Sequence, residues 1–173
     1  MAAAVAGSGY AVTTIADIVR EAGVSRRTFY EQFATKADCF IALYEAASRN
    51  ALIVLRNAID PAHDWEQQLE SALSAYLGEM AQNPTLMRTL FIEILGLGDD
   101  GLAARRRVNQ EIVSFMLAVV NAGQGGRKRR SPLTREIATA VVGGINELVL
   151  QAIEQDRVSQ LRDLAAPASE LVR

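Results

Sequence analysis

The sequence predicts an all-α fold, with an N-terminal helix-turn-helix domain over residues 1–45 and a larger helical domain over residues 46–173. The composition favours helices, because 50% of the residues are hydrophobic, 6% are aromatic and only 4 are prolines. Three helix-capping patterns follow one another near the N-terminus. Further along the chain, apolar residues recur at i, i+3, i+4 and i+7, which is the spacing of amphipathic helices.

The capping patterns predict two short helices joined by a tight turn, with a third helix directly after. The hydroxyl of Thr14 can cap a helix whose Asp17 carboxylate reaches back to an unpaired backbone amide. Gly23 follows the last apolar position of this helix, where a left-handed residue would close it. The later helix starts are marked by Ser25 and by Thr35 with Asp38.

The second short helix has an apolar side and a polar side. Phe29 and Phe33 share the apolar side and are expected in a core. The other side offers two guanidinium groups, a hydroxyl and a phenol, which suit the base edges and phosphates of a DNA major groove. A solvated helical hairpin whose arginines have no partner is the alternative. The outward residues are Arg26, Arg27, Thr28 and Tyr30.

A dense set of residues carries a family resemblance: Gly9-Tyr10, Thr14-Ile15-Ala16-Asp17-Ile18, Ala22-Gly23-Val24-Ser25, Thr28-Phe29-Tyr30, Phe33 and Lys36. They resemble the DNA-binding domain of the TetR (tetracycline-repressor-like) transcriptional regulators. Beyond this segment, the chain resembles the family only in its helical layout.

The resemblance implies a sequence-specific DNA-binding regulator, a homodimer on a palindromic operator in double-stranded DNA. It also implies repression that a small-molecule effector releases. Base contact is carried over to Arg26 and Arg27, and Lys36 would hold a flanking phosphate. The full set of implied DNA contacts is Thr14, Ser25, Arg26, Arg27, Thr28, Tyr30 and Lys36.

The start of the chain departs from this family pattern. The pattern usually begins with a full amphipathic helix, whereas here only Ala2–Ala6 remain. We therefore expect a truncated first helix, or a registered start downstream of the true one. A rival function stays open on this ground: a helical ligand-binding or interaction protein of the same fold with little affinity for DNA.

Six helices, counting the third helix named above, are expected from apolar spacing and from proline and glycine breaks. Loops are expected at residues 96–101 and 122–130, and the basic run at the end of the second loop is either a solvated loop or a second nucleic-acid contact. Pro167 is expected to kink the last helix. The expected helices are residues 36–59, 64–82, 84–95, 102–121, 131–152 and 159–172.

The helices expected at residues 131–152 and 159–172 are expected to form a dimer interface. A single short recognition helix reads about half of a site, and a symmetric dimer reaches two half-sites. The alternative is that both helices pack only on their own chain. The expected interface residues are Val141, Ile145, Leu148, Val149, Leu161 and Leu164.

An effector pocket is expected among three consecutive middle helices. Their methionine and aromatic side chains can adapt to a small apolar ligand, although each is also an ordinary core residue. Glu93, His63 and Asn146 are possible polar anchors. The expected lining residues are Trp65, Tyr76, Met80, Met87, Phe91, Phe115 and Met116.

Several function classes find little support in the sequence. No phosphate-binding loop, nucleophile elbow or zinc-protease motif is present, so we expect neither an enzyme nor a cofactor or metal site. Cys39 is the single cysteine, and a buried thiol is expected in preference to a redox sensor. No apolar run approaches the ~20 residues that span a bilayer, and the N-terminus is not a convincing signal peptide, so a cytoplasmic protein is expected.

Residues 1–60 contain six Lys or Arg residues and six Asp or Glu residues, and the whole chain has a net charge of −2. Any affinity for DNA must therefore come from charges sorted locally on one surface, since the domain as a whole is not basic.

Overall fold

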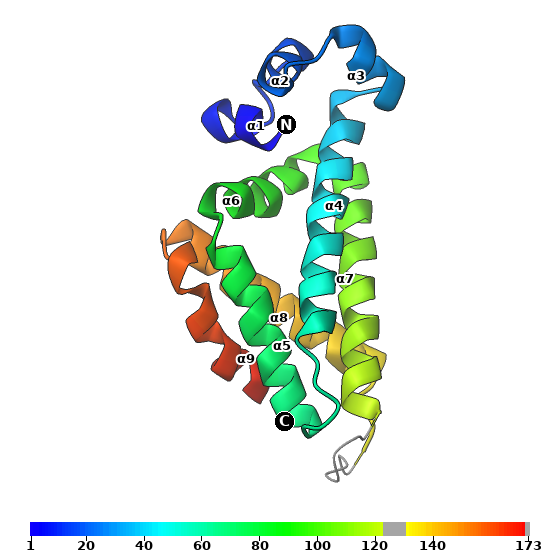
Figure 1. The fold of residues 1–173 in the computed structure, drawn as a ribbon, viewed down its shortest axis with the longest axis vertical. Helices are drawn as coiled ribbons and strands as arrows, with labels where there is room; N and C mark the ends of the chain where they lie inside the picture. The colour runs from blue at the N-terminus through cyan, green and yellow to red at the C-terminus, as the bar shows by residue number, and fades with distance from the viewer. Residues whose placement is uncertain (123–130, 172–173) are drawn as a thin grey trace. The chain divides into compact units, whose positions relative to one another are not determined.

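The computed structural model describes residues 1–122 and 131–171 (Figure 1). These residues form helices and no β-strand, which confirms the predicted all-α class. The elements are α1 (Ala2–Ser8), α2 (Ile15–Ala22), α3 (Arg26–Gln32), α4 (Lys36–Asn57), α5 (Trp65–Ala81), α6 (Pro84–Ile92), η1 (Glu93–Leu97), α7 (Gly98–Asn121), α8 (Arg135–Glu154), η2 (Val158–Leu164) and α9 (Ala165–Glu170), where η denotes a 3-10 helix.

The chain divides into two compact units, and neither is a single continuous segment. Unit 1 contains Met1–Ser48 and Thr85–Arg106, and unit 2 contains Arg49–Pro84 and Arg107–Arg173. Helices α4 and α7 therefore each begin in unit 1 and end in unit 2. A boundary between a binding and a regulatory domain at residue 45 stays a prediction.

The start and end of α2 follow from its sequence. The Thr14 hydroxyl accepts a hydrogen bond from the Asp17 backbone N–H, and the Asp17 carboxylate accepts one from the Thr14 backbone N–H, which is a complete capping box. Gly23 ends the helix with a φ of 64°, a left-handed conformation that glycine adopts without a Cβ clash. The predicted helix and both of its boundaries are confirmed.

A small hydrophobic core holds the first three helices together. It contains the buried residues Ile18, Val19, Phe29 and Cys39, with Met1, Ala4, Ile15 and Phe33 packed against it. Helix α1 has 7 residues, as its truncated pattern predicts, yet it packs against α2 and buries Val5 almost completely. The short first helix therefore still covers the core.

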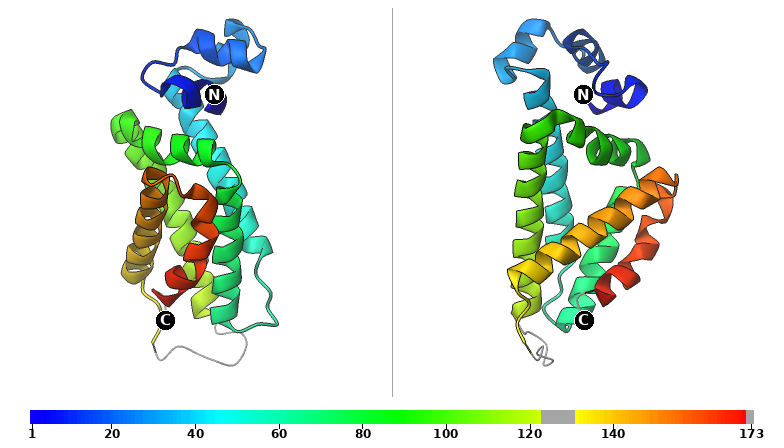
Figure 2. Two further views of the ribbon diagram at one scale, coloured as in Figure 1. Left: turned by 90° about the vertical axis from the view of Figure 1, so that its left-hand side faces the viewer. Right: turned by 180° about the vertical axis from the view of Figure 1, so that it is seen from behind.

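Unit 2 is a helical bundle in which η2 and α9 pack against α5. Helix α8 packs against η2 as well. Figures 1 and 2 show α9 running beside α5 in all views. The residues fully buried in this unit are mostly large and aliphatic, and they include Leu77, Val113, Val149, Ile153 and Leu161.

The loop predicted at residues 96–101 is wrong. A 3-10 turn continues α6 as far as Leu97, and α7 begins at Gly98 instead of at residue 102. Glycine and aspartate in this segment indicated a loop, but Asp99 and Asp100 lie in the first turn of α7, where carboxylates interact favourably with the helix dipole. Gly101 is a helical glycine against which the backbone of Ile94 packs closely.

The predicted ends of the last two helices also need correction. Helix α8 begins at Arg135 with Thr134 as its N-cap, and Ser131-Pro132 precede it outside the helix. The C-terminal segment is 3-10 up to Leu164 and α-helical from Ala165. Pro167 lies in the first turn of α9, where proline is tolerated because a helix start leaves its backbone N–H groups unpaired.

Two further sequence expectations concern the basic run of the loop at 122–130 and the absence of a membrane-spanning run. The basic run of the loop at 122–130 lies in residues 123–130, which are not described. Within the described ranges, α8 alone is long and apolar enough to cross a membrane, although the sequence showed no such run. Its apolar residues Val141, Val142, Ile145 and Val149 are buried in unit 2, so α8 serves here as a core helix.

Candidate nucleic-acid interface

Aromatic side chains that pack into the small core hold helix α3 in place. Phe29 is 5% exposed and belongs to the small core, and its ring centroid lies 5.6 Å from that of Phe33. The Tyr30 ring meets Phe29 edge-on at 5.5 Å but is itself 57% exposed. This packing fixes which residues of α3 face solvent.

The solvent side of α3 carries the residues predicted for base contact. Arg26, Arg27 and Thr28 are all exposed. The Arg27 side chain is 90% exposed, and its Nε donates to a Glu31 carboxylate oxygen at 3.0 Å. An exposed ion pair of this kind contributes at most about 1 kcal/mol, so Arg27 can exchange Glu31 for a nucleic acid at little cost.

The hydroxyls at the start of α3 are paired with each other. Ser25 Oγ accepts from the Thr28 backbone N–H at 3.1 Å and lies 2.9 Å from the Thr28 hydroxyl oxygen. Only one of these two hydroxyls donates to the other, so the pair retains one proton for a phosphate. Ser25 and Thr28 are therefore brought together at the exposed N-terminus of the recognition helix.

Thr14 is less suited to phosphate contact than its position implies. Its hydroxyl donates to the Asp17 carboxylate at 2.6 Å, so its proton is already used. Hydrogen bonds from Thr14 and a further one from Arg20 lower the Asp17 pKa to about 2, so this carboxylate is negative at neutral pH. A negative charge at the N-terminus of α2 repels phosphate.

Lys36 is directed at the protein backbone. Its ammonium donates to the carbonyl oxygens of Tyr10 at 2.7 Å, Thr13 at 2.8 Å and Ala11 at 3.4 Å. The same group lies 4.2 Å from the centroid of the Tyr10 ring, within the range of a cation–π interaction. All three donors of Lys36 are thus used to hold the turn between α1 and α2, and this geometry disfavours a phosphate contact.

Glu93 anchors the same turn from η1, within unit 1. One of its carboxylate oxygens accepts from the Tyr10 backbone N–H at 3.0 Å. The Tyr10 ring also packs edge-on against Phe40 of α4 at 5.3 Å. Glu93 was considered from sequence only as a pocket anchor, because no local pattern links two residues separated by 83 positions.

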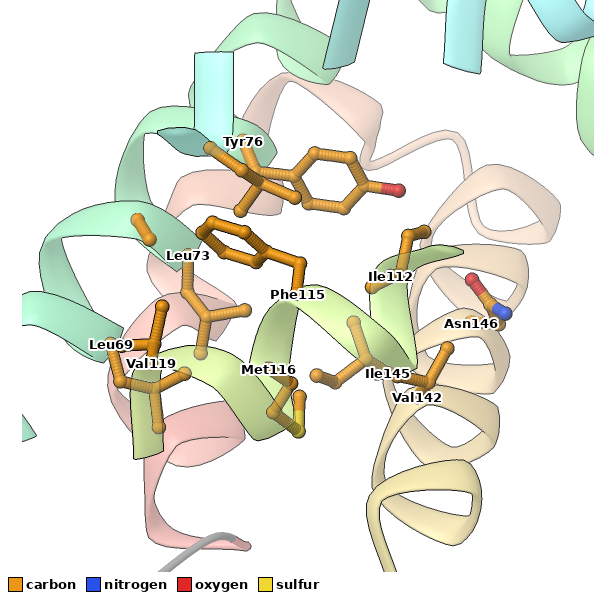
Figure 3. A pocket seen from close by; sticks show the side chains of 12 residues that line it. Leu69, Leu73, Tyr76, Ile112, Phe115, Met116, Val119, Val142, Ile145 and Asn146 are labelled. Carbon is orange, nitrogen blue, oxygen red and sulfur yellow. The ribbon is translucent and has the colours of Figure 1, made fainter. Parts of the chain in front are cut away.

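Unit 2 contains an apolar cavity of about 30 Å³ (Figure 3). Of the predicted lining residues, Tyr76, Phe115 and Met116 line it. Trp65 and Met80 are buried in unit 2 without lining this cavity, while Met87 and Phe91 belong to unit 1. The lining residues that were not predicted for the pocket are Leu55, Leu69, Ala72, Leu73, Ile112, Val119, Val142 and Ile145.

Asn146 also lines the cavity, as one of the polar anchors considered from sequence. His63 instead is exposed beside Asp60, with its Nδ1 at 3.3 Å from the carboxylate. The signal that could have found the aliphatic lining was the apolar stripe of α5 and α8, but a stripe does not reveal which residues leave space between them.

The predicted dimer residues are mostly packed within their own chain. Val141, Ile145, Val149 and Leu161 are buried without any partner chain, whereas Leu148 and Leu164 are half-buried. The exposed side of α8 instead carries Ile137, which is 52% exposed, with Ala140 and Gly143. An interface on α8 would use this second side.

The structure shows a buried thiol at Cys39, as expected, and burial raises its pKa. In the described part of the chain, no group of three or more His, Cys, Asp or Glu side chains is arranged to hold a metal ion.

Comparisons with known proteins bear on the family. The family model described as "Bacterial regulatory proteins, tetR family" matches residues 2–43. The fatty acid degradation regulator FadR from Bacillus halodurans has a similar fold, with a TM-score of 0.86 at 19% identity over 99% of this chain and 92% of that chain. FadR from Bacillus subtilis, solved in complex with stearoyl-CoA, gives a TM-score of 0.85 at 19% identity with the same coverage.

A TetR-like transcriptional regulator from Rhodococcus sp. RHA1 is also similar, with a TM-score of 0.69 at 18% identity over 97% of this chain and 88% of that chain. At these identities the solved structures establish the fold, while the match over residues 2–43 identifies the helix-turn-helix segment. Over residues 2–43 the chain therefore matches the tetR family of bacterial regulatory proteins, and its overall fold is similar to those of solved TetR-like regulators.

Proposed function

We propose that this protein is a sequence-specific DNA-binding transcriptional regulator that uses α3 as its recognition helix. The observation that carries the proposal is the geometry of α3. Phe29 anchors the helix in the core, and Arg26 and Arg27 are exposed to solvent in its first turn. Guanidinium groups are the most frequent specific partners of a guanine edge in the major groove.

The proposed DNA contacts are narrower than the set implied by sequence resemblance. Arg26, Arg27 and Tyr30 are the candidates for base edges, and the Ser25–Thr28 hydroxyl pair is the candidate for phosphate. Thr14 and Lys36 are left out, because their donors are used inside unit 1. The small core supports this proposal against the rival without DNA affinity, since α1 still packs on α2.

We further propose a homodimer that joins through the exposed side of α8. Ile137 and Ala140 are exposed there, and a Cβ added at Gly143 would meet nothing within 4 Å. The small residues Ala140 and Gly143 would let a second helix approach closely. A two-fold dimer would then place two recognition helices on two half-sites of a palindrome.

Regulation by a small apolar effector is proposed for the cavity in unit 2. Leu55, in the last turns of α4, lines this cavity, while α4 begins directly after the helix-turn-helix. A ligand that favours one position of α4 would shift the population of DNA-binding states, with repression relieved as the outcome. FadR from Bacillus subtilis, a protein of similar fold, was solved with stearoyl-CoA, whose acyl chain is a long hydrocarbon, and this supports a ligand with an apolar part here.

The test of DNA reading is an affinity measurement on the DNA flanking the protein's own gene. Arg27→Ala is expected to weaken specific binding by about 1–3 kcal/mol, since one bidentate base contact is lost. Arg157→Ala, an exposed arginine of unit 2, is the matched control and should leave the affinity unchanged. Binding that ignores sequence and disappears with salt would favour the rival ligand-binding function.

A further inference from the structure

Asn146 is an unusual member of the cavity lining. It comes from α8, is 8% exposed, and faces a cavity whose other lining side chains are hydrocarbon, sulfur or the Tyr76 phenol. A buried carboxamide among apolar side chains costs free energy unless its polar atoms have partners. Its orientation therefore decides what the cavity can recognise.

One end of the Asn146 side chain is already bound. Its Nδ2 donates to Oδ1 of Asn109 on α7 at 3.1 Å, and both residues belong to unit 2. This hydrogen bond uses one of the two N–H donors of the amide and restricts its rotation. Asn109 is in this sense a positioning residue for Asn146.

The other end faces the cavity. Figure 3 shows the Asn146 oxygen on the cavity side of the carboxamide and the nitrogen on the far side. Among the described residues, every fully enclosed side-chain nitrogen or oxygen has a hydrogen-bond partner. Asn146 forms its hydrogen bond through the nitrogen and not through the oxygen. The oxygen is therefore an accessible acceptor.

From this geometry we infer that the effector is a neutral molecule with an apolar body and a hydrogen-bond donor, such as an alcohol or a phenol, that donates to Asn146 Oδ1. The inference rests on the proposed effector site and names the ligand class. The Tyr76 hydroxyl can both donate and accept, so it does not discriminate between ligands. Among the described residues, no cationic side chain lines the cavity, which disfavours a carboxylate beside the Asn146 oxygen.

The apolar part of the ligand is less restricted. The cavity is far smaller than the ~300–1,000 Å³ of typical ligand sites, so the lining must rearrange on binding. Met116 and Phe115 border the space, and an unbranched methionine changes rotamer easily. Shape selection is therefore loose, whereas the fixed carboxamide makes polar selection strict.

The experiment compares three probes with the same ten-carbon body: decan-1-ol, decyl methyl ether and decanoate. Binding to the full chain is measured by competition with the neutral dye Nile red. We expect decan-1-ol to bind about tenfold more tightly than the ether, since only the alcohol satisfies the buried acceptor. Decanoate should bind most weakly at pH 8, where it is ionised.

Two variants separate the role of Asn146 from general packing. Asn146→Leu is expected to bring the alcohol and the ether to within about twofold of each other, because the acceptor is gone. Tyr76→Phe should keep the alcohol preference. The wild-type comparison stands even if a variant fails to fold.

The outcomes distinguish this inference from the proposed function. Equal binding of alcohol and ether to the wild type, or a preference that survives in Asn146→Leu, would overturn the donor inference and leave the effector site in place. Failure of all three probes to compete with Nile red would remove the proposed site and the inference with it.

Discussion

At the scale of single residues, paired hydroxyl and carboxylate groups define where the N-terminal helices begin. Thr14 with Asp17 and Thr35 with Asp38 each exchange hydrogen bonds over three residues. These pairs could be predicted from sequence because the partners are close in the chain. Lys36 and Glu93 could not be assigned in this way, because their partner Tyr10 is distant in sequence.

The Asp17 capping box should make stability depend on pH. The folded-state pKa of about 2 lies below the ordinary value of 3.8, so Asp17 stabilises the folded state above pH 4 and loses this effect as the pH falls toward 2. We expect the difference in melting temperature between wild type and Asp17→Asn to be constant from pH 7 to about 5 and to narrow below pH 4. A difference that does not change with pH would contradict this assignment.

Lys36→Met tests whether this lysine supports the fold. Loss of hydrogen bonds from a charged donor to three carbonyl oxygens should lower the free energy of unfolding by about 1–3 kcal/mol. Urea denaturation followed by circular dichroism measures the change, with the exposed Arg56→Met as control. If Lys36→Met instead weakened DNA binding with stability unchanged, Lys36 would be a phosphate contact after all.

At the scale of elements, periodicity predicts which helices exist better than it predicts where they start. Residues 96–101 are predicted as a loop from the sequence, because glycine and aspartate are frequent in turns. The structure continues the chain as helix, since the two aspartates lie in the first turn of α7. The C-terminal segment shows the same limit, because its change from 3-10 to α-helix at Ala165 has no sequence signal.

The close approach at Gly101 yields a prediction for α7. A Cβ at Gly101 would collide with the backbone of Ile94, which cannot rotate away as a side chain can. Gly101→Ala should therefore lower the free energy of unfolding by about 1–3 kcal/mol. Gly96→Ala is the matched control, since a Cβ there meets nothing within 4 Å. Equal melting temperatures for the two variants would show that η1 and α7 are not packed in this way.

At the scale of the whole molecule, the fold was predictable and the sites were predictable only in part. The helix-turn-helix was visible in sequence because its caps, turn and aromatic anchors are local. The cavity was not, because its lining comes from α4, α5, α7 and α8 and depends on how their side chains leave space. The dimer residues illustrate the same point, since an apolar stripe on α8 serves its own core.

Sequence-specific reading by two symmetric copies of α3 is tested most directly by a footprint on the DNA flanking the protein's own gene. The account predicts a protected palindrome whose half-sites lie one helical turn apart or a multiple of it, ~34–36 Å per turn, and whose protection is lost in Arg27→Ala. Protection without sequence preference, or a footprint that Arg27→Ala leaves intact, would contradict it.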